Sequence, residues 1–486
     1  MKTIRCFASL YGLAKSACVL ALVVFLVATL SVRSQAGLFD FTIKDEKELG
    51  DKFNVLVRSH LQLVEDPYII DYVRGITDRI LRQMPPTLFP IKVGVVDDPS
   101  MNAFAAPAGY MYVFTGLILN LDHESELAAV ISHELAHVSE RHLANRMESF
   151  QKISIGALLG MLAGLAAGVA SGNSDIGGAV AAGSRALGAT AMLKYSRDDE
   201  READKAGLTF LVDAGFQPNG MRGAFETMQR MRWFKGTGTI PTYLSTHPGL
   251  SERVGYIEDQ IKKMPANIQN RPEDDVNFKR VQTLVRARYT PPKSALSAFN
   301  KAGDSTCLDR LGLAIALSRQ NNKSPAGPVF EKALACGGSD PLFLREAGFY
   351  YQSMRQFDKA EGYLSRAVLD NPQDSLALFE YARLLSQQRK DADAIGVMKK
   401  VVALVPDNPD VRQGYGQILG SAGEMFGAQL QFAYAAMYRG DKRKTEYFME
   451  RAEKAQGHNP ENSRALKRFK EEYEKRREIW KELKMD

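Results

Sequence analysis

Two histidines and a glutamate within one helical segment have the residue types and spacing of a metal site. His133, Glu134 and His137 lie in the strongly helical run 126–138. Four helical steps bring the chain back to nearly the same face, so both imidazoles can bind one Zn²⁺. Glu134 lies beside them, where a carboxylate can act as a general base. The spacing is typical of metal-dependent peptide hydrolysis.

A hydrolytic zinc site needs a third protein ligand and one open position. One class, the metzincins, would have glycine at position 140 and histidine at position 143, but this chain has Glu140 and Leu143, which excludes that class. His142 follows His137 by five residues, which is about 140° around a continuous helix. We therefore expect His142 to pack against another helix or to face solvent, away from the metal.

Glu200 is the predicted third ligand. It lies in the acidic helical segment 195–207, and Asp204 follows one turn later on the same face. A carboxylate at that place can bind the outer nitrogen of a ligand histidine. Glu202 is expected to point elsewhere. A solvated charged helix is the alternative interpretation of this segment.

The elements that position these residues can be read from the periodicity. Apolar residues recur at helical spacing from Lys44 to Arg82, and residues 90–96, 103–106 and 110–113 have the pattern of strands. The turn Pro107-Ala108-Gly109 joins the last two, and helix resumes at Glu124. An extended substrate could add to the edge strand, which would contact it through Asn102, Ala103, Phe104 and Ala105.

Residues 153–193 are rich in glycine and alanine. Residues 153–172 carry no charge, and glycine recurs at every fourth position from Gly156 to Gly172. Such a stripe lets another helix pack closely. We interpret the segment as a buried or membrane-surface helical hairpin with 176–193 as its return arm. An integral membrane span is the alternative.

The first 36 residues have the pattern of a secretory signal peptide. Basic residues precede an uncharged apolar run at 17–30, and Ser34-Gln35-Ala36 is a small-x-small cleavage site. Cleavage would follow Ala36. An uncleaved anchor is the alternative, because residues 16–32 are almost long enough to span a bilayer.

Composition indicates a globular, multi-domain protein. The chain has 486 residues, 45% hydrophobic and 25% charged, which implies two or three cores. Its formal net charge of +6 falls to +2 without the leader, which carries four basic residues and no acidic one. No nucleic-acid surface is indicated. Cys307 and Cys336 remain after processing and could pair in an oxidising compartment, although two separate buried thiols are an equal alternative.

A helical repeat of 34 residues follows a tract, 264–306, that is rich in Pro, Asn, Lys and Arg and that we interpret as a linker. Small and large residues keep their register over four units: Ala314, Gly348, Ala382 and Gly416; Ala326, Ala360, Ala394 and Ala428; Phe330, Leu364, Met398 and Phe432; Ala333, Ala367, Val401 and Ala435. This pattern predicts four tetratricopeptide repeats at 307–440, with capping helices at 441–486.

Together these motifs resemble the gluzincin metallopeptidases that include HtpX and the CAAX prenyl type-I endopeptidases. The resemblance is carried by His133-Glu134-x-x-His137, by Ser196-Arg197-x-x-Glu200-x-x-x-Asp204 and by the strand-turn-strand at 102–116. Where the family has Pro-Gly-Gly in the turn, this chain has Pro107-Ala108-Gly109. The resemblance implies an α+β, mostly helical fold, in which a catalytic domain at 37–263 with a small β-sheet precedes an all-α solenoid.

The same resemblance implies one zinc ion per chain and two further catalytic residues. The family has a His-Pro followed by an arginine, matched here by His247-Pro248 and Arg253. His247 would stabilise the oxyanion, or bind the open zinc position and block it. A plain loop histidine is the alternative.

The order of leader, catalytic domain and repeats resembles the periplasmic β-barrel assembly-enhancing proteases. It implies an exported zinc endopeptidase, peripheral to the membrane, that acts on misfolded or stalled outer-membrane β-barrel proteins. The repeats would dock substrate or the β-barrel assembly machinery. Two alternatives stay open: a repeat-based chaperone or scaffold with a latent protease domain, and an integral-membrane CAAX-type protease in which 153–172 spans the bilayer.

Overall fold

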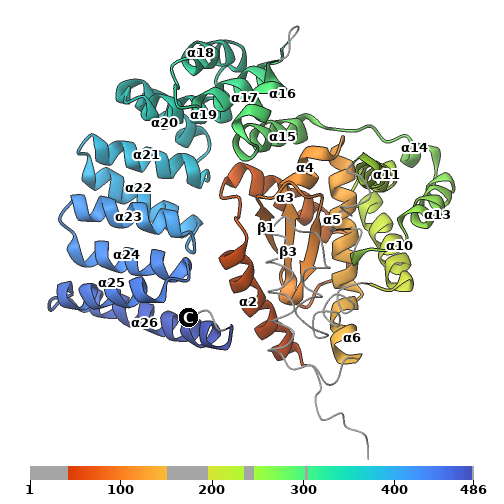
Figure 1. Cartoon of the computed structure of the whole chain (residues 1–486), viewed down its shortest axis with the longest axis horizontal. Coiled ribbons are helices and arrows are strands. Elements are labelled where there is room, and N and C mark those ends of the chain that lie inside the picture. The colour runs from red at the N-terminus through yellow and green to blue at the C-terminus, as the bar shows by residue number, and fades with distance from the viewer. Residues whose placement is uncertain (1–41, 150–194, 235–242, 244–245, 301–304, 484–486) are drawn as a thin grey trace, which may run out of the picture.

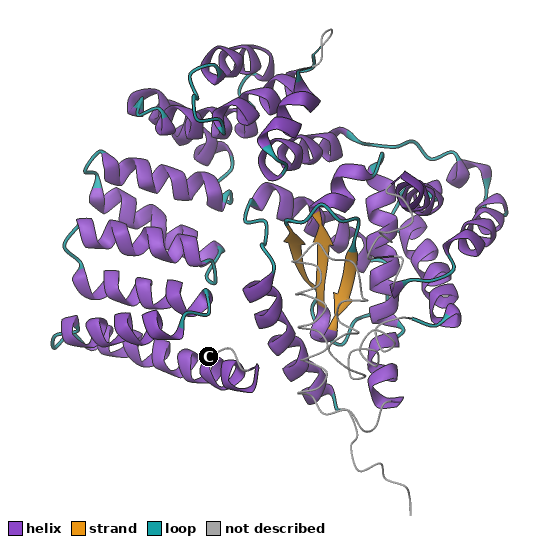
Figure 2. Ribbon diagram, in the orientation of Figure 1, coloured by secondary structure: helices purple, strands orange, loops and turns teal. Residues whose placement is uncertain are grey.

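The computed structural model describes residues 42–149, 195–234, 243, 246–300 and 305–483 (Figure 1). The predicted leader and the predicted hairpin at 153–193 lie outside these residues. The described chain has two parts. A mixed part with a small sheet contains the predicted site, and a helical array lies along one side of it (Figures 1 and 2).

The N-terminal helical run is divided into two helices, α2 (Ile43–His60) and α3 (Pro67–Leu81), where the periodicity predicted one run. The side chain of Asp66 accepts a hydrogen bond from the Tyr68 amide, and Pro67 stands at the first helical position. An aspartate N-cap and a proline at this position begin a new helix. Between the two helices, Leu63 pairs with Val96 at the edge of the sheet.

The predicted strands are confirmed. They are β1 (Lys92–Val96), β2 (Ala103–Ala106) and β3 (Tyr110–Phe114), in the order β1-β3-β2, with β1 parallel and β2 antiparallel to β3. The short 3₁₀ turn η1 (Pro107–Gly109) joins β2 to β3. Ala108 has a φ of 59° there, a left-handed conformation that glycine adopts more easily. The departure from Pro-Gly-Gly therefore keeps the turn at a modest cost in strain.

The central helix α5 (Glu124–Ser139) begins at the predicted residue and packs against β2, α3, α10 (Arg197–Asp213) and α11 (Asn219–Phe234). The short helix α4 (Thr115–Asn120), which the sequence did not indicate, connects it to β3. Figures 1 and 2 show the sheet between α2 and α5. Residues 124–137 are buried almost throughout α5, so its histidines and glutamate lie inside the molecule.

A capping box begins one of the other helices near the site. Ser196 and Asp199 form a capping box that starts α10, as serine followed by an acid three residues later favours. The helix α6 (His142–Ser149) follows α5 after a turn, and α13 (Leu250–Lys262) packs against α10 and α11.

The tract 264–306, which we predicted as a linker, is largely helical over its described residues. It contains α14 (Ala266–Gln269), α15 (Val276–Tyr289) and α16 (Pro292–Phe299), and α15 packs against α3, α4 and the first repeat. Phe278, Val281, Leu284 and Val285 are fully buried in α15. Because the tract as a whole has a polar composition, the sequence did not indicate this apolar helical face.

The repeat prediction is confirmed as a stack of helix pairs. The first helices of the four pairs begin 34 residues apart, at 307, 341, 375 and 409. A Cβ placed on Gly348 would lie 2.6 Å from the Leu364 side chain, and one on Gly416 would lie 2.7 Å from Phe432, so the small residues do accommodate the large ones. The pairs are α17 (Cys307–Ser318) with α18 (Ala326–Gly337), α19 (Pro341–Ser353) with α20 (Phe357–Asp370), α21 (Ser375–Gln387) with α22 (Asp391–Leu404), and α23 (Pro409–Ser421) with α24 (Met425–Tyr438).

Two further helices, α25 (Lys442–Ala455) and α26 (Pro460–Leu483), follow the last pair. In the first pair, a disulfide joins Cys307 to Cys336, which resolves the alternatives that the sequence left open.

The array contacts the mixed part at both of its ends. Arg345 on α19 is fully buried and donates hydrogen bonds to Asp66 and Asp374. Burial alone would raise the pKa of Asp66, but the charges of Arg345 and Arg288 outweigh it and hold the pKa below its usual value. At the other end, Lys52 of α2 forms an ion pair with Glu482 of α26. The array therefore extends along α2 and α3 (Figure 1).

Gly207 gives a test of how this fold positions the site. A Cβ on Gly207 would lie 3.1 Å from both N and Cα of His133, because α10 crosses α5 at this point. We expect Gly207→Val to force the helices apart, to destabilise the protein by about 1–3 kcal/mol and to weaken zinc binding at least about tenfold. Thermal unfolding and zinc titration measure both effects.

Gly75→Val is the matched control, because Gly75 is exposed on α3 and nothing lies within 4 Å of a Cβ placed there. We expect that variant to bind zinc like the parent. Equal zinc affinity in the Gly207 and Gly75 variants would contradict the proposed role of the crossing.

Candidate metal centre

Three elements bring the predicted ligands together. The helix α5 supplies His133 and His137, α10 supplies Glu200, and the segment before α13 supplies His247. All four side chains are buried, none being more than 2% exposed. Each offers a ligand atom, and the four atoms lie within 4.8 Å of one another.

The distances fit a tetrahedral ion. The Nε2 atoms of His133 and His137 are 3.0 Å apart, and each lies 3.6 Å from an oxygen of Glu200. Zinc bonds of about 2.05 Å at tetrahedral angles separate ligand atoms by about 3.3 Å. The residues present therefore fit a zinc ion held by His133, His137 and Glu200.

The protonation states also suit a metal. Burial lowers the pKa of His137 well below its usual value, so its imidazole stays neutral. Nδ1 of His133 lies 3.0 Å from Oδ1 of Asp204, which favours the tautomer whose Nε2 lone pair faces the ligand cluster. Asp204 thus has the predicted position behind a ligand histidine.

His142 supports the other ligand histidine. As expected, it is not among the candidate ligands and it contacts another helix, but its contact with His137 was not predicted. Its Nδ1 lies 2.9 Å from Nδ1 of His137, and His142 is only 5% exposed. The expectation assumed a continuous helix, but α5 ends at Ser139 and Arg141 has a left-handed φ of 54°. That turn brings His142 back beside His137. Glu202, which we expected to point away from the metal, lies 3.3 Å from Nε2 of His142.

Arg253 binds the carboxylates of Asp204, which lies behind His133, and of Glu200, a candidate ligand. Its Nε and Nη2 donate to Asp204, both at 2.7 Å, and its Nη1 forms an ion pair with Glu200. Burial would raise the pKa of Asp204, but Arg253 and His133 outweigh it and lower the pKa to about 2. The same competition, with His247 as the largest opposing charge, lowers the pKa of Glu200. Arg253 is thus placed to orient ligands, and this geometry makes it a positioning residue.

Sequence reasoning missed two tyrosines at the site. Tyr195 stacks on His137 with ring centroids 3.8 Å apart, and Tyr243 stacks on His247 at 4.2 Å. Both rings restrict the orientation of an imidazole. Tyr195 stands next to the Ser196 cap, which could have indicated its proximity to α10, whereas no pattern in the sequence indicated Tyr243.

Glu134 faces the ligand cluster from α5. Its Oε2 accepts a hydrogen bond from the amide of Ala105 on the edge strand, at 3.2 Å. Its Oε1 lies 3.5 Å from Nε2 of His247 and has no hydrogen-bond partner among the described residues. Burial raises the pKa of Glu134, although His247 and His133 oppose this. The carboxylate is therefore suited to take up a proton.

Two of the four edge-strand residues that we predicted to contact a substrate also make contacts within the protein. Because the Ala105 amide points to Glu134, the alternation of an antiparallel pair directs the backbone groups of Ala103 and Ala105 to the free edge. Asn102 instead accepts a hydrogen bond from the Phe114 amide, and the Phe104 ring packs against Phe53 and Tyr112. Substrate contact through Asn102, Ala103, Phe104 and Ala105 stays a prediction.

Comparison with known families agrees with this site. Residues 65–261 match peptidase family M48, and residues 351–418 match a tetratricopeptide repeat family. This chain carries an M48 domain. The match spans α3 to α13, and so includes all of the candidate ligands.

Three relatives align with this chain over different shares of its length. A putative β-barrel assembly-enhancing protease of Vibrio cholerae is 27% identical over 423 residues, which cover 79% of each chain. A β-barrel assembly-enhancing protease of Yersinia pestis is 23% identical over 379 residues, which cover 76% of each chain. The mitochondrial metalloendopeptidase OMA1 of Schizosaccharomyces pombe is 30% identical over 190 residues, 39% of this chain and 52% of the relative.

Within the described ranges, no helix has the length and apolar character needed to cross a membrane. The residues that the integral-membrane alternative requires, 153–172, lie outside those ranges.

Removal of single side chains tests the ligand set of the M48 domain. We expect His133→Ala, His137→Ala and Glu200→Ala to lower bound zinc from about one ion per chain to below about a tenth, because three ligands are the minimum for such a site. Glu134→Gln should retain zinc, and so should the control His458→Ala, whose side chain is exposed. Elemental analysis of the purified proteins gives the answer. Stoichiometric zinc in Glu200→Ala would show that the third ligand is another residue.

Proposed function

We propose that this protein is an exported zinc-dependent endopeptidase in which His133, His137 and Glu200 hold one zinc ion and Glu134 is the general base. The observation that carries this proposal is the position of Glu134. Its buried carboxylate faces the convergent ligand atoms and also bonds to the edge strand through Ala105. The M48 match supports a metallopeptidase, and the choice of zinc rests on the nitrogen and oxygen donors.

The residues divide the work of peptide hydrolysis. When bound, zinc supplies a Lewis acid that polarises a peptide carbonyl and lowers the pKa of water. Glu134 takes the proton of the attacking water on Oε1 and returns it to the leaving amine. Its raised pKa suits both steps. An extended substrate adds to β2 along the edge that faces away from β3.

The position of the His247 side chain supports the blocking role more than the oxyanion role. Its Nδ1 lies 3.3 Å from Nε2 of His133 and 2.8 Å from Oε1 of Glu200. These distances are close to those expected of a fourth tetrahedral ligand, which supports the blocking role. The arrangement also favours our second candidate function, a repeat-based chaperone or scaffold whose protease stays latent until His247 moves.

His247→Ala distinguishes the two roles. A blocking histidine opposes activity, so we expect proteolysis to increase in this variant at unchanged zinc content. A fall in activity would assign His247 to oxyanion stabilisation instead. Initial rates of casein cleavage, compared with those of the parent, provide the measurement.

Location and substrates follow from the leader, the disulfide and the relatives. The predicted signal peptide and the Cys307–Cys336 disulfide both support an oxidising compartment, the periplasm. The names of the relatives support misfolded or stalled outer-membrane β-barrel proteins as substrates. We propose that the repeats dock these substrates or the β-barrel assembly machinery, with the protein peripheral to the membrane.

Glu134→Gln is the direct test of the enzyme. We expect casein cleavage to fall about 10²- to 10⁴-fold at unchanged zinc content, because the amide cannot accept the proton. The matched control is Glu140→Gln, which makes the same change at the end of α5 and should leave the rate unchanged. Both are best measured in the His247→Ala background.

The same variant separates the two candidate functions in cells. If a strain that carries Glu134→Gln retains full function, the protease is not the working part and the chaperone or scaffold role is favoured. If that strain fails as a deletion does, hydrolysis is required.

A further inference from the structure

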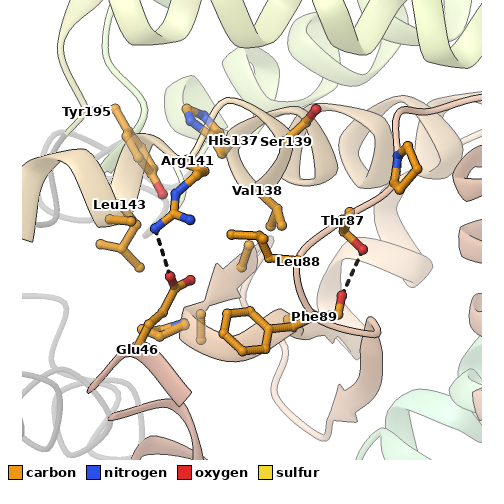
Figure 3. A pocket seen from close by; sticks show the side chains of 16 residues that line it. Glu46, Thr87, Leu88, Phe89, His137, Val138, Ser139, Arg141, Leu143 and Tyr195 are labelled. Carbon is orange, nitrogen blue, oxygen red and sulfur yellow. Dashed lines mark hydrogen bonds and ion pairs between the residues drawn. The ribbon is translucent and has the colours of Figure 1, made fainter. Parts of the chain in front are cut away.

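An apolar pocket opens beside the metal centre (Figure 3). It is a cavity of about 100 Å³ between β2, the end of α5 and the loop before β1. Its apolar wall is formed by Leu88, Phe89, Val138, Leu143 and Ala144. The pocket lies outside the ligand cluster, and the mechanism above assigns no role to it.

The position of the pocket connects it to the reacting bond. Ala105 and Ala106 of β2 form one side, and His137 with Val138 forms another. Ala105 is the residue whose amide bonds to Glu134, and His137 is a candidate zinc ligand. A chain that lies along the free edge of β2 with its carbonyl at the metal therefore directs a neighbouring side chain into this pocket.

The size and polarity of the pocket select the side chain. An apolar cavity of about 150 Å³ holds benzene, whereas one water needs only about 10–15 Å³. A space of 100 Å³ is thus suited to a leucine side chain or an aromatic ring. Leu88 at the opening is 56% exposed, so its side chain is accessible to a bound substrate.

The two charged residues at the pocket, Arg141 and Glu46, form an ion pair with each other. Arg141 binds Glu46 at 3.1 Å, beside Leu143 at one end of the pocket (Figure 3). The pair presents no net charge, so nothing here favours a lysine or an aspartate of the substrate. The left-handed turn at Arg141 also places Leu143 in the wall.

We propose that this pocket is a specificity subsite that takes one large apolar side chain next to the scissile bond. The inference rests on the proposed peptidase function and adds its substrate class. Folded proteins bury such side chains, whereas extended, unfolded chains expose them. The subsite thus recognises unfolded polypeptide by the chemistry of one residue, and the discrimination against a small side chain is about 10- to 200-fold.

Cleavage-site mapping tests the subsite. The full-length protein in the His247→Ala background digests unfolded casein and a mixed peptide library, and mass spectrometry identifies the bonds cut. We expect Leu, Phe or Met to be enriched at one fixed position beside the cut. Leu143→Trp, which fills the cavity, should shift that position to Ala or Gly, and Leu88→Asp should lower cleavage after or before large apolar residues at least about tenfold.

Leu369→Asp is the matched control for Leu88→Asp, because Leu369 is 79% exposed on α20 in the repeats. Its profile should equal that of the parent. An unselective profile in the parent, or an unchanged profile in Leu88→Asp, would overturn the subsite while leaving the peptidase intact. Absence of any cut that depends on Glu134, in protein that binds zinc, would overturn the proposed function and the subsite with it.

Discussion

The close crossing of α5 and α10 at Gly207 is the constraint on which the metal centre depends. The backbone of His133 lies against a residue without a side chain, so the two helices approach within reach of one ion. Gly207 follows Glu200 by seven residues, two helical turns, and both therefore face α5. Asp204 lies on the same face. One contact thus directs a ligand and its supporting carboxylate toward His133.

This approach creates a problem of buried charge that Arg253 and a metal ion solve together. Glu200, Asp204 and Glu134 are each about 1% exposed or less. A buried ion costs several kcal/mol unless it is paired. Arg253 pairs with Asp204 and Glu200, and a divalent cation would compensate Glu200 from the other side. A bound metal would therefore contribute to the stability of this part of the protein as well as to chemistry.

The sequence was sufficient to predict helices, strands and repeats wherever residues of one kind recur with a fixed period. The four-residue spacing of His133 and His137 and of Glu200 and Asp204 predicted shared helical faces, and the structure brings these faces together. The alternation near Ala103 and the 34-residue register were equally informative, because strands and repeats have fixed periods.

Features that depend on a single dihedral angle or on tertiary packing could not be predicted. The contact of His142 with His137 was not predicted because the left-handed turn at Arg141 has no signature in a residue that is not glycine. The helix α15 was read as linker because its apolar face is only one side of a polar tract, and it is buried by distant elements. Tyr243 reaches the site from a segment without any recognisable motif.

The buried Arg345 has a consequence for the modularity of the protein. Repeat arrays are commonly treated as interchangeable cassettes whose units contact only their neighbours. Here a guanidinium from the second repeat is fully buried against Asp66, the residue that starts α3 in the catalytic part. Truncating Arg345 would remove the bidentate partner of this buried carboxylate, at a cost of about 3–5 kcal/mol. The array is therefore an integral part of the catalytic fold, and a repeat taken from another protein could replace it only if it carried the matching arginine.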